Sequence, residues 1–272
     1  MRAIVYHEYG TPAVLELHDI ERPVVKEGEV LVRVLAGAVN SGDWDLLRGK
    51  PYILRPMTGL RRPKNGVLGL AIAGRIEALG ENVTTFKPGD EVYTELSRGG
   101  FAEYACVPAV ALARKPSNLT YEQAAAVPVA GVTALQALRD TGRVESGQKV
   151  LINGASGGVG TFAVQIAKAL GAKVTGVCGT TNVALVRSIG ADHVVDYTQE
   201  DLAANGPRYD LIFDNVGNRS LSDYRRALTR KGTVIPNSNK GRGNLIGGYL
   251  ARALQALVVS LFVPQRLRPM AA

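Results

Sequence analysis

Two patterns of hydrophobic and polar residues divide the chain. Up to about residue 120, apolar and polar residues alternate in short runs, such as 29–35 and 67–79, and turns rich in glycine, proline and aspartate separate these runs. Alternation with a period of two is typical of half-buried strands. The pattern therefore predicts a β-rich domain over residues 1–120, folded as a partly closed barrel.

Beyond residue 120, short apolar runs alternate with helical patterns. Residues 149–153 form a buried strand pattern, and residues 161–170 place apolar side chains at helical spacing. Such alternation predicts an α/β fold with a parallel, doubly wound sheet over residues 121–272. The later strands are predicted at 172–179, 193–197, 209–215 and 232–236, with a helix at 221–228.

A turn of small residues joins the strand at 149–153 to the helix that follows. Ala155, Gly157 and Gly160 have the spacing of a dinucleotide fingerprint, with Ala155 in place of the first glycine. Small residues allow a tight turn and let a pyrophosphate approach the backbone, and the helix N-terminus attracts the anion. We therefore predict a dinucleotide site here, the alternative being an ordinary glycine turn. The predicted contacts are Ala155, Ser156, Gly157, Gly158, Val159 and Gly160.

The end of the strand at 172–179 carries no acidic residue. An NAD-preferring site usually has Asp or Glu about 20 residues after the first glycine position, whereas residues 177–182 of this chain are VCGTTN. A carboxylate repels a 2′-phosphate, and hydroxyl and amide groups bind it. We therefore expect NADP(H) to be favoured over NAD(H), with Thr180, Thr181 and Asn182 as contacts. Alternatively, Thr180 or Thr181 caps the next helix.

Other cofactor contacts are expected where further strands end, because ligands of parallel sheets lie beyond the carboxyl ends of the strands. Asn215, Val216 and Gly217 follow such a strand and are expected to border the nicotinamide. Tyr197 ends the strand at 193–197 and is expected to flank the adenosine. Each of these residues can instead simply end its strand.

Several motifs, in the same order along the chain, carry a resemblance to a known family. They are MRAIVYHEYG, VNSGDW, FKPGDEV, GGFAEYACVP, AGVTALQAL and INGASGGVGTFAVQIAK. Together they resemble the medium-chain dehydrogenase/reductase superfamily, and most closely its zinc-free quinone oxidoreductase and reticulon-interacting-protein-like branch, which includes bacterial proteins described as NAD(P)-dependent alcohol dehydrogenases. The resemblance implies a GroES-like catalytic domain, a Rossmann domain, and NADPH-dependent transfer of hydride to a quinone, enone or carbonyl substrate. Members normally return to the catalytic domain at their C-terminus, so we expect this chain to be C-terminally truncated.

The chain has few ligands for zinc. Zinc-dependent relatives have a cysteine where this chain has Val39 and Asn40, and a Gly-His-Glu segment near residues 69–71, which here are Gly-Leu-Ala. The two cysteines, Cys106 and Cys178, and three histidines are too few for either standard zinc site. We therefore expect no metal. Two isolated cysteines, which we expect to be buried, also fit a reducing cytoplasm.

Without a metal, hydrogen-bond donors must polarise the substrate oxygen. By resemblance to the family's VN-x-x-D segment, Asn40 is our first candidate, either for this role or for binding the nicotinamide ribose. Tyr52 is the second candidate donor. Asp43 and Trp44 are more simply interpreted as a helix N-cap and a core anchor. Thr133 is expected near the cofactor by resemblance, or else bonded to the preceding helical turn.

The net charge and one long apolar segment bear on whether the protein binds nucleic acid, a membrane or a second subunit. The net charge of +8 does not by itself indicate nucleic-acid binding, since no basic recognition helix or RNA motif accompanies it. The apolar segment 245–263 contains Arg252 and Gln255, which disfavours a membrane span, so we expect a helix that covers the cleft or contacts a second subunit in a homodimer. The N-terminus has no signal-peptide pattern. We expect a cytoplasmic enzyme with a small-molecule substrate; the alternative is an NADPH-binding sensor, scaffold or remnant with little or no catalysis.

Overall fold

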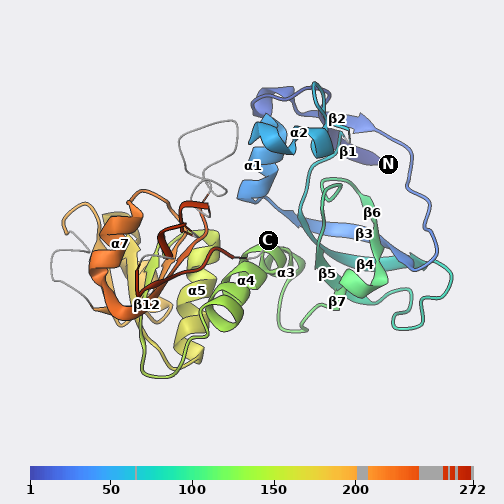
Figure 1. The fold of residues 1–272 in the computed structure, drawn as a ribbon. Coiled ribbons are helices and arrows are strands. Elements are labelled where there is room, and N and C mark those ends of the chain that lie inside the picture. The colour runs from blue at the N-terminus through green and yellow to red at the C-terminus, as the bar shows by residue number, and fades with distance from the viewer. Residues whose placement is uncertain (65, 201–207, 239–253, 257, 261–262, 271–272) are drawn as a thin grey trace. The chain divides into compact units, whose positions relative to one another are not determined.

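Two structural units, Met1–Val129 and Ala130–Ala272, make up the chain (Figure 1). The computed structural model describes residues 1–64, 66–200, 208–238, 254–256, 258–260 and 263–270. Antiparallel strands dominate the first unit, and a parallel sheet with helices on both faces dominates the second.

The first unit contains two antiparallel sheets. β1 (Arg2–Val5) pairs with β2 (Glu16–Asp19), and five strands form a second sheet in the order β6-β3-β4-β5-β7. Apolar side chains of this second sheet, including Val30, Val32 and Ile72, form its buried core. The five strands are β3 (Glu29–Ala38), β4 (Ala71–Leu79), β5 (Glu91–Glu95), β6 (Tyr104–Pro108) and β7 (Ala113–Arg114). The helices are α1 (Ser41–Arg48), α2 (Arg55–Thr58) and α3 (Tyr121–Ala125), with helical turns at Pro12–Val14, Tyr52–Leu54 and Ala109–Ala111.

β4 is shorter than the hydrophobic pattern predicts. It begins at Ala71, not at residue 67. Val67 pairs with Val5 of β1 instead, and Gly69 has a φ of 107°, which no extended strand adopts. The expectation of one strand over 67–79 was therefore wrong for its first four residues, because an apolar run does not reveal a change of pairing partner.

The second unit is a six-stranded parallel sheet with strand order β10-β9-β8-β11-β12-β13. This is the doubly wound sheet that the alternating pattern predicts. The strands are β8 (Lys149–Asn153), β9 (Lys173–Cys178), β10 (His193–Asp196), β11 (Tyr209–Asp214), β12 (Leu228–Pro236) and β13 (Arg266–Leu267). The helices are α5 (Gly158–Ala169), α6 (Val183–Ser188) and α7 (Leu221–Ala227), with helical turns at Gln136–Thr141 and Thr180–Asn182; α4 (Val127–Leu135) spans the division between the units.

Alternate residues of each strand pack on opposite faces of the parallel sheet. Val150 and Ile152 of β8 join the cluster that contains Ala163 of α5. Leu151, between them, joins the cluster that contains Tyr224 of α7. α5 and α7 therefore cover opposite faces of the sheet (Figure 1), and the turns that leave the carboxyl ends of the strands remain available for a ligand.

Two boundaries in this unit differ from the sequence prediction. α5 begins at Gly158, three residues before the expected start, because the glycine-rich turn is itself part of the helix. β12 begins at Leu228, directly after α7, and not at Gly232. The start of this strand was not predicted because residues 229–231 are polar. In the structure, Leu228 pairs with Tyr209 of β11.

Most of the apolar segment 245–263 lies outside the described residues, and so does most of the helix expected there. Within the described part of the chain, no helix has both the length and the apolar character needed to cross a membrane.

Candidate cofactor and active site

The turn between β8 and α5 exposes its backbone at the start of the helix. Gly160 packs so closely that a Cβ there would lie 2.0 Å from the carbonyl oxygen of Gly154, so only glycine fits. At Gly157 and Gly158, by contrast, a Cβ would meet nothing closer than 3.4 Å, and both residues are exposed. The fold does not require glycine at these two positions, so the open backbone there leaves room for a ligand.

The start of α5 has the properties of an anion-binding site. The helix has 12 residues, and its N-cap residue, Gly157, has no side chain to accept a hydrogen bond. The N–H groups of the first turn have no intrahelical acceptors, and the helix dipole is positive at this end. The predicted contacts therefore form one continuous turn that suits a pyrophosphate. Ala155 and Gly160 are buried in this turn, Ser156 and Val159 are half-buried, and Gly157 and Gly158 are exposed.

The Thr180 side chain, at the tip of β9, is bonded to an acidic residue. Its Oγ1 donates to Oδ2 of Asp196 over 2.6 Å. Asp196 ends β10 and lies opposite Cys178 of β9 in the parallel register. Hydrogen bonds from Thr180 and Thr198 stabilise the carboxylate and lower the pKa of Asp196. This acid is not evident from the sequence fingerprint, because Asp196 ends the third strand of this unit and the acid of the fingerprint ends the second.

The other predicted contacts on this side surround the same turn. Thr181 is exposed, and Asn182 is the N-cap residue of α6, although its side chain makes no capping hydrogen bond. The alternative role of Thr180 or Thr181 as a helix cap was wrong: Gly179 precedes the helical turn, and the Thr180 hydroxyl bonds to Asp196. Tyr197 is 56 % exposed, and its hydroxyl oxygen lies 3.2 Å from where a Cβ on Gly179 would be.

A buried carboxylate fixes the loop after β11. Asp214 is fully buried, and its Oδ1 accepts the N–H groups of Val216 (3.1 Å) and Gly217 (3.0 Å). The same oxygen accepts Nδ2 of Asn153 at 2.9 Å, which ties the carboxyl end of β8 to that of β11. Sequence reasoning missed Asp214 and Asn153 as well; the available signal was a polar residue at the end of each buried strand.

Asn215 has a donor suited to a ligand. Its Oδ1 accepts a hydrogen bond from Nδ2 of Asn237 at 2.9 Å. Its own Nδ2 is buried and has no hydrogen-bond partner among the described residues. A buried amide without an acceptor costs free energy, so a ligand oxygen at this point would be stabilising. Together with the open turn at Gly157, this donor makes the carboxyl edge of the sheet fit a dinucleotide.

Thr133 lies on α4, close to the start of α5. A Cβ on Gly158 would lie 3.9 Å from the Cβ of Ala130, which is one turn earlier on α4. Thr133 is half-buried, and its hydroxyl makes no hydrogen bond to the described residues. The alternative bond to the preceding helical turn is therefore absent in the described part of the chain.

Asn40, in the first unit, occupies the N-cap position of α1. Its Nδ2 donates to the carbonyl oxygen of Ala38 over 3.0 Å, and its backbone N–H donates to Oδ2 of Asp43 over 2.8 Å. An asparagine amide carries two N–H groups. The bond to Ala38 and a side-chain hydrogen bond with the Asp43 carboxylate orient this amide.

Asp43 and Trp44 differ from their expected roles. Asp43 is the third residue of α1, not its N-cap, and its buried carboxylate accepts the N–H groups of Asn40 and Gly69. Burial raises the pKa of Asp43, against the opposite effect of these hydrogen bonds. Trp44 is 42 % exposed and is not a core anchor, because the inward positions of α1 are Asp43 and Leu47.

Tyr52 presents an exposed phenol. The Arg55 guanidinium lies 4.5 Å from the Tyr52 ring centroid and 4.6 Å from that of Tyr9, so a cation–π contact orients the ring. The Tyr52 hydroxyl makes no hydrogen bond to a described residue, and its side chain is 38 % exposed. It is placed to donate to a molecule at this surface.

The cysteine and histidine side chains do not fit a zinc site. Cys178 is buried on β9, but Cys106, on β6, is only half-buried, contrary to expectation. His18 bonds Glu16 at 2.7 Å and lies 6.0 Å from His7, and His193 begins β10. Over the described ranges, no three His, Cys, Asp or Glu side chains form a group that could hold a metal ion.

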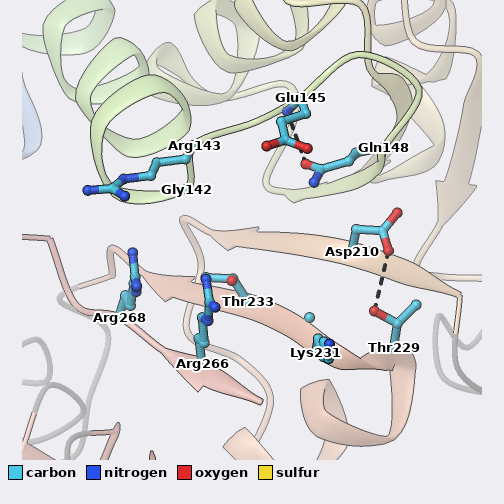
Figure 2. Close-up of a pocket in the computed structure, with 11 residues that line it drawn as sticks. Gly142, Arg143, Glu145, Gln148, Asp210, Thr229, Lys231, Thr233, Arg266 and Arg268 are labelled. Carbon is cyan, nitrogen blue, oxygen red and sulfur yellow. Dashed lines mark hydrogen bonds between the residues drawn. The ribbon is translucent and has the colours of Figure 1, made fainter. Parts of the chain in front are cut away.

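A pocket of about 350 Å³ lies at the other end of the parallel strands, where β8, β11, β12 and β13 begin. Figure 2 shows Arg143, Arg266 and Arg268 directed toward one space, with Asp210 bonded to Thr229 beside it. None of the predicted cofactor or catalytic residues lines this pocket, so it is separate from the candidate site.

Comparisons with known proteins identify the family. The model of the alcohol dehydrogenase GroES-like domain matches residues 26–117, and that of the zinc-binding dehydrogenase matches residues 158–256. A chloroplast envelope quinone oxidoreductase homolog of Arabidopsis thaliana is 36% identical over 248 residues, which cover 86% of this chain and 74% of the relative. An NADPH-dependent alkenal/one oxidoreductase of the same plant is 36% identical over 229 residues, which cover 80% of this chain and 58% of the relative.

A solved structure agrees with these matches over the whole chain. The crystal structure of Escherichia coli quinone oxidoreductase complexed with NADPH superposes with a TM-score of 0.83 and 26% identity, covering 100% of this chain and 81% of that chain. Both units therefore have the fold of this family. The chain belongs to the medium-chain dehydrogenase/reductase superfamily, in its quinone oxidoreductase-like branch, as the sequence motifs predict.

Proposed function

We propose that the protein is a zinc-independent, NAD(P)H-dependent reductase of quinone, enone or other carbonyl substrates, with NADPH as the favoured reductant. The observation that carries the proposal is the carboxyl edge of the parallel sheet. There the open turn at Gly157 adjoins a buried donor on Asn215 that has no hydrogen-bond partner among the described residues. The names of the relatives supply the substrate classes.

The residues of the second unit would hold the cofactor. The first-turn N–H groups of α5 would bind the pyrophosphate. Asp214 holds the loop at 215–217, so that Asn215 can donate to the nicotinamide half of the molecule. Thr180, Thr181, Asn182 and Tyr197 would surround the adenosine half, and Thr133 would flank the start of α5. When bound, the cofactor supplies the hydride that reduces the substrate.

Asn40 would donate to the substrate oxygen as negative charge develops on it. A donor aimed at such an oxygen performs the task that a metal ion performs in zinc-dependent enzymes. The bond from Asn40 to Ala38 fixes the orientation of the amide before the substrate binds. The amide polarises the oxygen without giving up its proton, so Tyr52, whose phenol is exposed, is the candidate for donating the proton that completes the reduction.

The preference for NADPH is supported by the tip of β9, which carries hydroxyl and amide groups and no acid of its own. The names of an Arabidopsis relative and of an Escherichia coli structure, which both include NADPH, also support this preference.

We place the enzyme in the cytoplasm, where Cys106 and Cys178 would stay reduced, and we expect a homodimer.

Fluorescence titration of the purified chain with NADPH and NADH tests the cofactor, and a panel of quinones, enones and aldehydes tests the reaction. We expect tighter binding of NADPH and cofactor oxidation with at least one substrate class. Tighter binding of NADH would contradict the preference. Binding of NADPH without turnover across the panel would favour the alternative, a cofactor-binding protein with little catalysis.

A further inference from the structure

The fold brings an acidic residue to the place where the second strand lacks one. Asp196 ends β10, sixteen residues after Thr180 along the chain. β9 and β10 are parallel neighbours, and the pairing of Asp196 with Cys178 puts the carboxylate beside the turn at 179–182. An acid at the end of the second strand is the group that binds the ribose 2′-hydroxyl of NAD and repels the 2′-phosphate of NADP. Here a third strand supplies the acid.

The hydrogen bonds around Asp196 fix the direction of two hydroxyl groups. Thr180 Oγ1 donates to Oδ2 over 2.6 Å, and Thr198 Oγ1 donates to Oδ1 over 2.8 Å. A hydroxyl carries a single proton, so Thr180 offers only lone pairs to a ligand while it bonds Asp196. Phosphate oxygens accept hydrogen bonds and would find no donor in this hydroxyl. A ribose hydroxyl, in contrast, can donate to it or to the carboxylate.

Among the described residues, no cation forms an ion pair that balances the charge of Asp196. Any group that bonds Thr180 lies within two hydrogen-bond lengths of the carboxylate, which is less than the Debye length at physiological ionic strength. A 2′-phosphate at this position would therefore be repelled with little screening.

We propose that Asp196 is a specificity-determining residue that weakens binding of the 2′-phosphate and gives the 2′-hydroxyl of NADH a partner, so that this chain accepts both cofactors. The inference rests on the proposed function, because it requires the dinucleotide to bind at the ends of β8 and β9. It also refines the proposed preference for NADPH, because the charge of Asp196 limits how tightly the wild type binds NADPH.

The test compares Asp196→Asn with the wild type in titrations with NADPH and NADH. Asparagine keeps the shape and a hydrogen-bond acceptor but removes the charge. We expect the Kd for NADPH to fall by about tenfold and the Kd for NADH to stay or rise. Competition by 2′,5′-ADP should strengthen in parallel, and competition by 5′-AMP should not, which would assign the effect to the adenosine half of the site.

Asp192→Asn is the matched control. It removes the same charge just before β10, where Asp192 bonds Lys168 at the opposite end of the strand. We expect the ratio of the two Kd values to remain that of the wild type. In Asp196→Asn, the one acceptor oxygen can remain with Thr198, so that the NH2 group faces Thr180 and the Thr180 hydroxyl proton becomes available to a phosphate. Adding Thr180→Val should then reverse part of the gain for NADPH. Thermal melts establish that each variant is folded.

These titrations distinguish a failure of the Asp196 proposal from a failure of the proposed function. A ratio of Kd values in Asp196→Asn within twofold of the wild-type ratio, with both cofactors bound, would overturn the role of Asp196 and leave the proposed function intact. A folded wild type that binds neither cofactor would overturn the proposed function and this inference with it.

Discussion

Asn153 and Asp214 hold the two central strands of the parallel sheet together at their carboxyl ends. Nδ2 of Asn153 donates to Oδ1 of Asp214 over 2.9 Å, and both side chains are buried. Because the same carboxylate oxygen accepts the N–H groups of Val216 and Gly217, one buried group sets both the spacing of β8 and β11 and the course of the loop proposed to face the nicotinamide.

Replacing Asp214 should therefore affect stability and cofactor binding together. Asp214→Ala leaves one buried and two partly buried donors without this acceptor, and we expect a loss of about 2 to 5 kcal/mol in the free energy of unfolding. Asp214→Asn keeps an acceptor oxygen and should cost less. Urea unfolding and NADPH titration measure the two effects. Asp210→Asn, at the other end of β11, is the control, and equal effects of both asparagine variants on NADPH affinity would contradict the role of Asp214.

The two glycines of the α5 turn should respond differently to alanine. Gly160→Ala would place a Cβ 2.0 Å from the Gly154 carbonyl oxygen and should prevent normal folding. Gly157→Ala has room for its Cβ and should fold with a stability change of about 1 kcal/mol or less. Its added methyl group would nevertheless occupy the space proposed for the pyrophosphate, so NADPH affinity should fall at least about tenfold. Thermal melts measure the effect of each variant on folding, and titrations of the same samples measure NADPH affinity. Unchanged NADPH affinity in Gly157→Ala would show that this turn is not part of the cofactor site.

Local patterns in the sequence were sufficient to predict the β8–α5–β9 unit. Its strands are short and apolar, its helix has a clear period, and its glycines have a steric role that spacing alone suggests. The same logic failed for Trp44, because a large apolar residue was assigned to the core without asking which positions of α1 face inward.

The polar groups that complete the candidate site were not predictable in this way. Asp196 reaches the turn at 179–182 only through the parallel register of β9 and β10. Asn153 and Asp214 are 61 residues apart and meet only because β8 and β11 are neighbours in the sheet. Hydrophobic periodicity identifies strands but not their order, so contacts that depend on strand order remain hidden until the fold is known.

Removal of metal ions should leave the reaction unchanged. Over the described residues, no three His, Cys, Asp or Glu side chains form a group that could hold a metal ion, and Asn40 is proposed to perform the polarising role. Exhaustive dialysis against a chelator, followed by metal analysis and activity measurement, provides the test. Stoichiometric zinc whose removal abolishes turnover and whose return restores it would contradict the proposal.

The stability of the first unit should depend on Glu91 in acid. Hydrogen bonds from Tyr121, Lys115 and Arg75 lower the pKa of Glu91 from 4.5 to about 2. A lowered folded-state pKa means that this stabilisation is complete above the unfolded value of 4.5 and is lost as the pH falls toward about 2. Glu91→Gln should reduce stability at neutral pH and flatten its acid dependence. Urea midpoints across this range measure the effect, with Glu77→Gln as the control at an exposed ion pair; an unchanged acid slope in Glu91→Gln would contradict the assignment.

Asn40 tests the proposed chemistry most directly. If its amide stabilises the negative charge that develops on the substrate oxygen, Asn40→Ala should lower turnover by about 10- to 1000-fold, as expected for the loss of one oxyanion donor. The affinity for NADPH should change much less. The competing view is that Asn40 matters only as the residue that begins α1, where it bonds Ala38 and Asp43.

The two views of Asn40 differ in whether its replacement lowers stability or turnover. A purely structural role predicts a loss of about 1 kcal/mol in stability with turnover nearly intact. Asn40→Asp keeps a side chain suited to the N-cap position but has no N–H to donate, so it should lose turnover even when thermal melts show that it is folded. Thermal melts and steady-state kinetics on both variants separate these outcomes. Normal turnover by a folded Asn40→Asp enzyme would eliminate Asn40 as the donor and leave Tyr52 as the group to replace next.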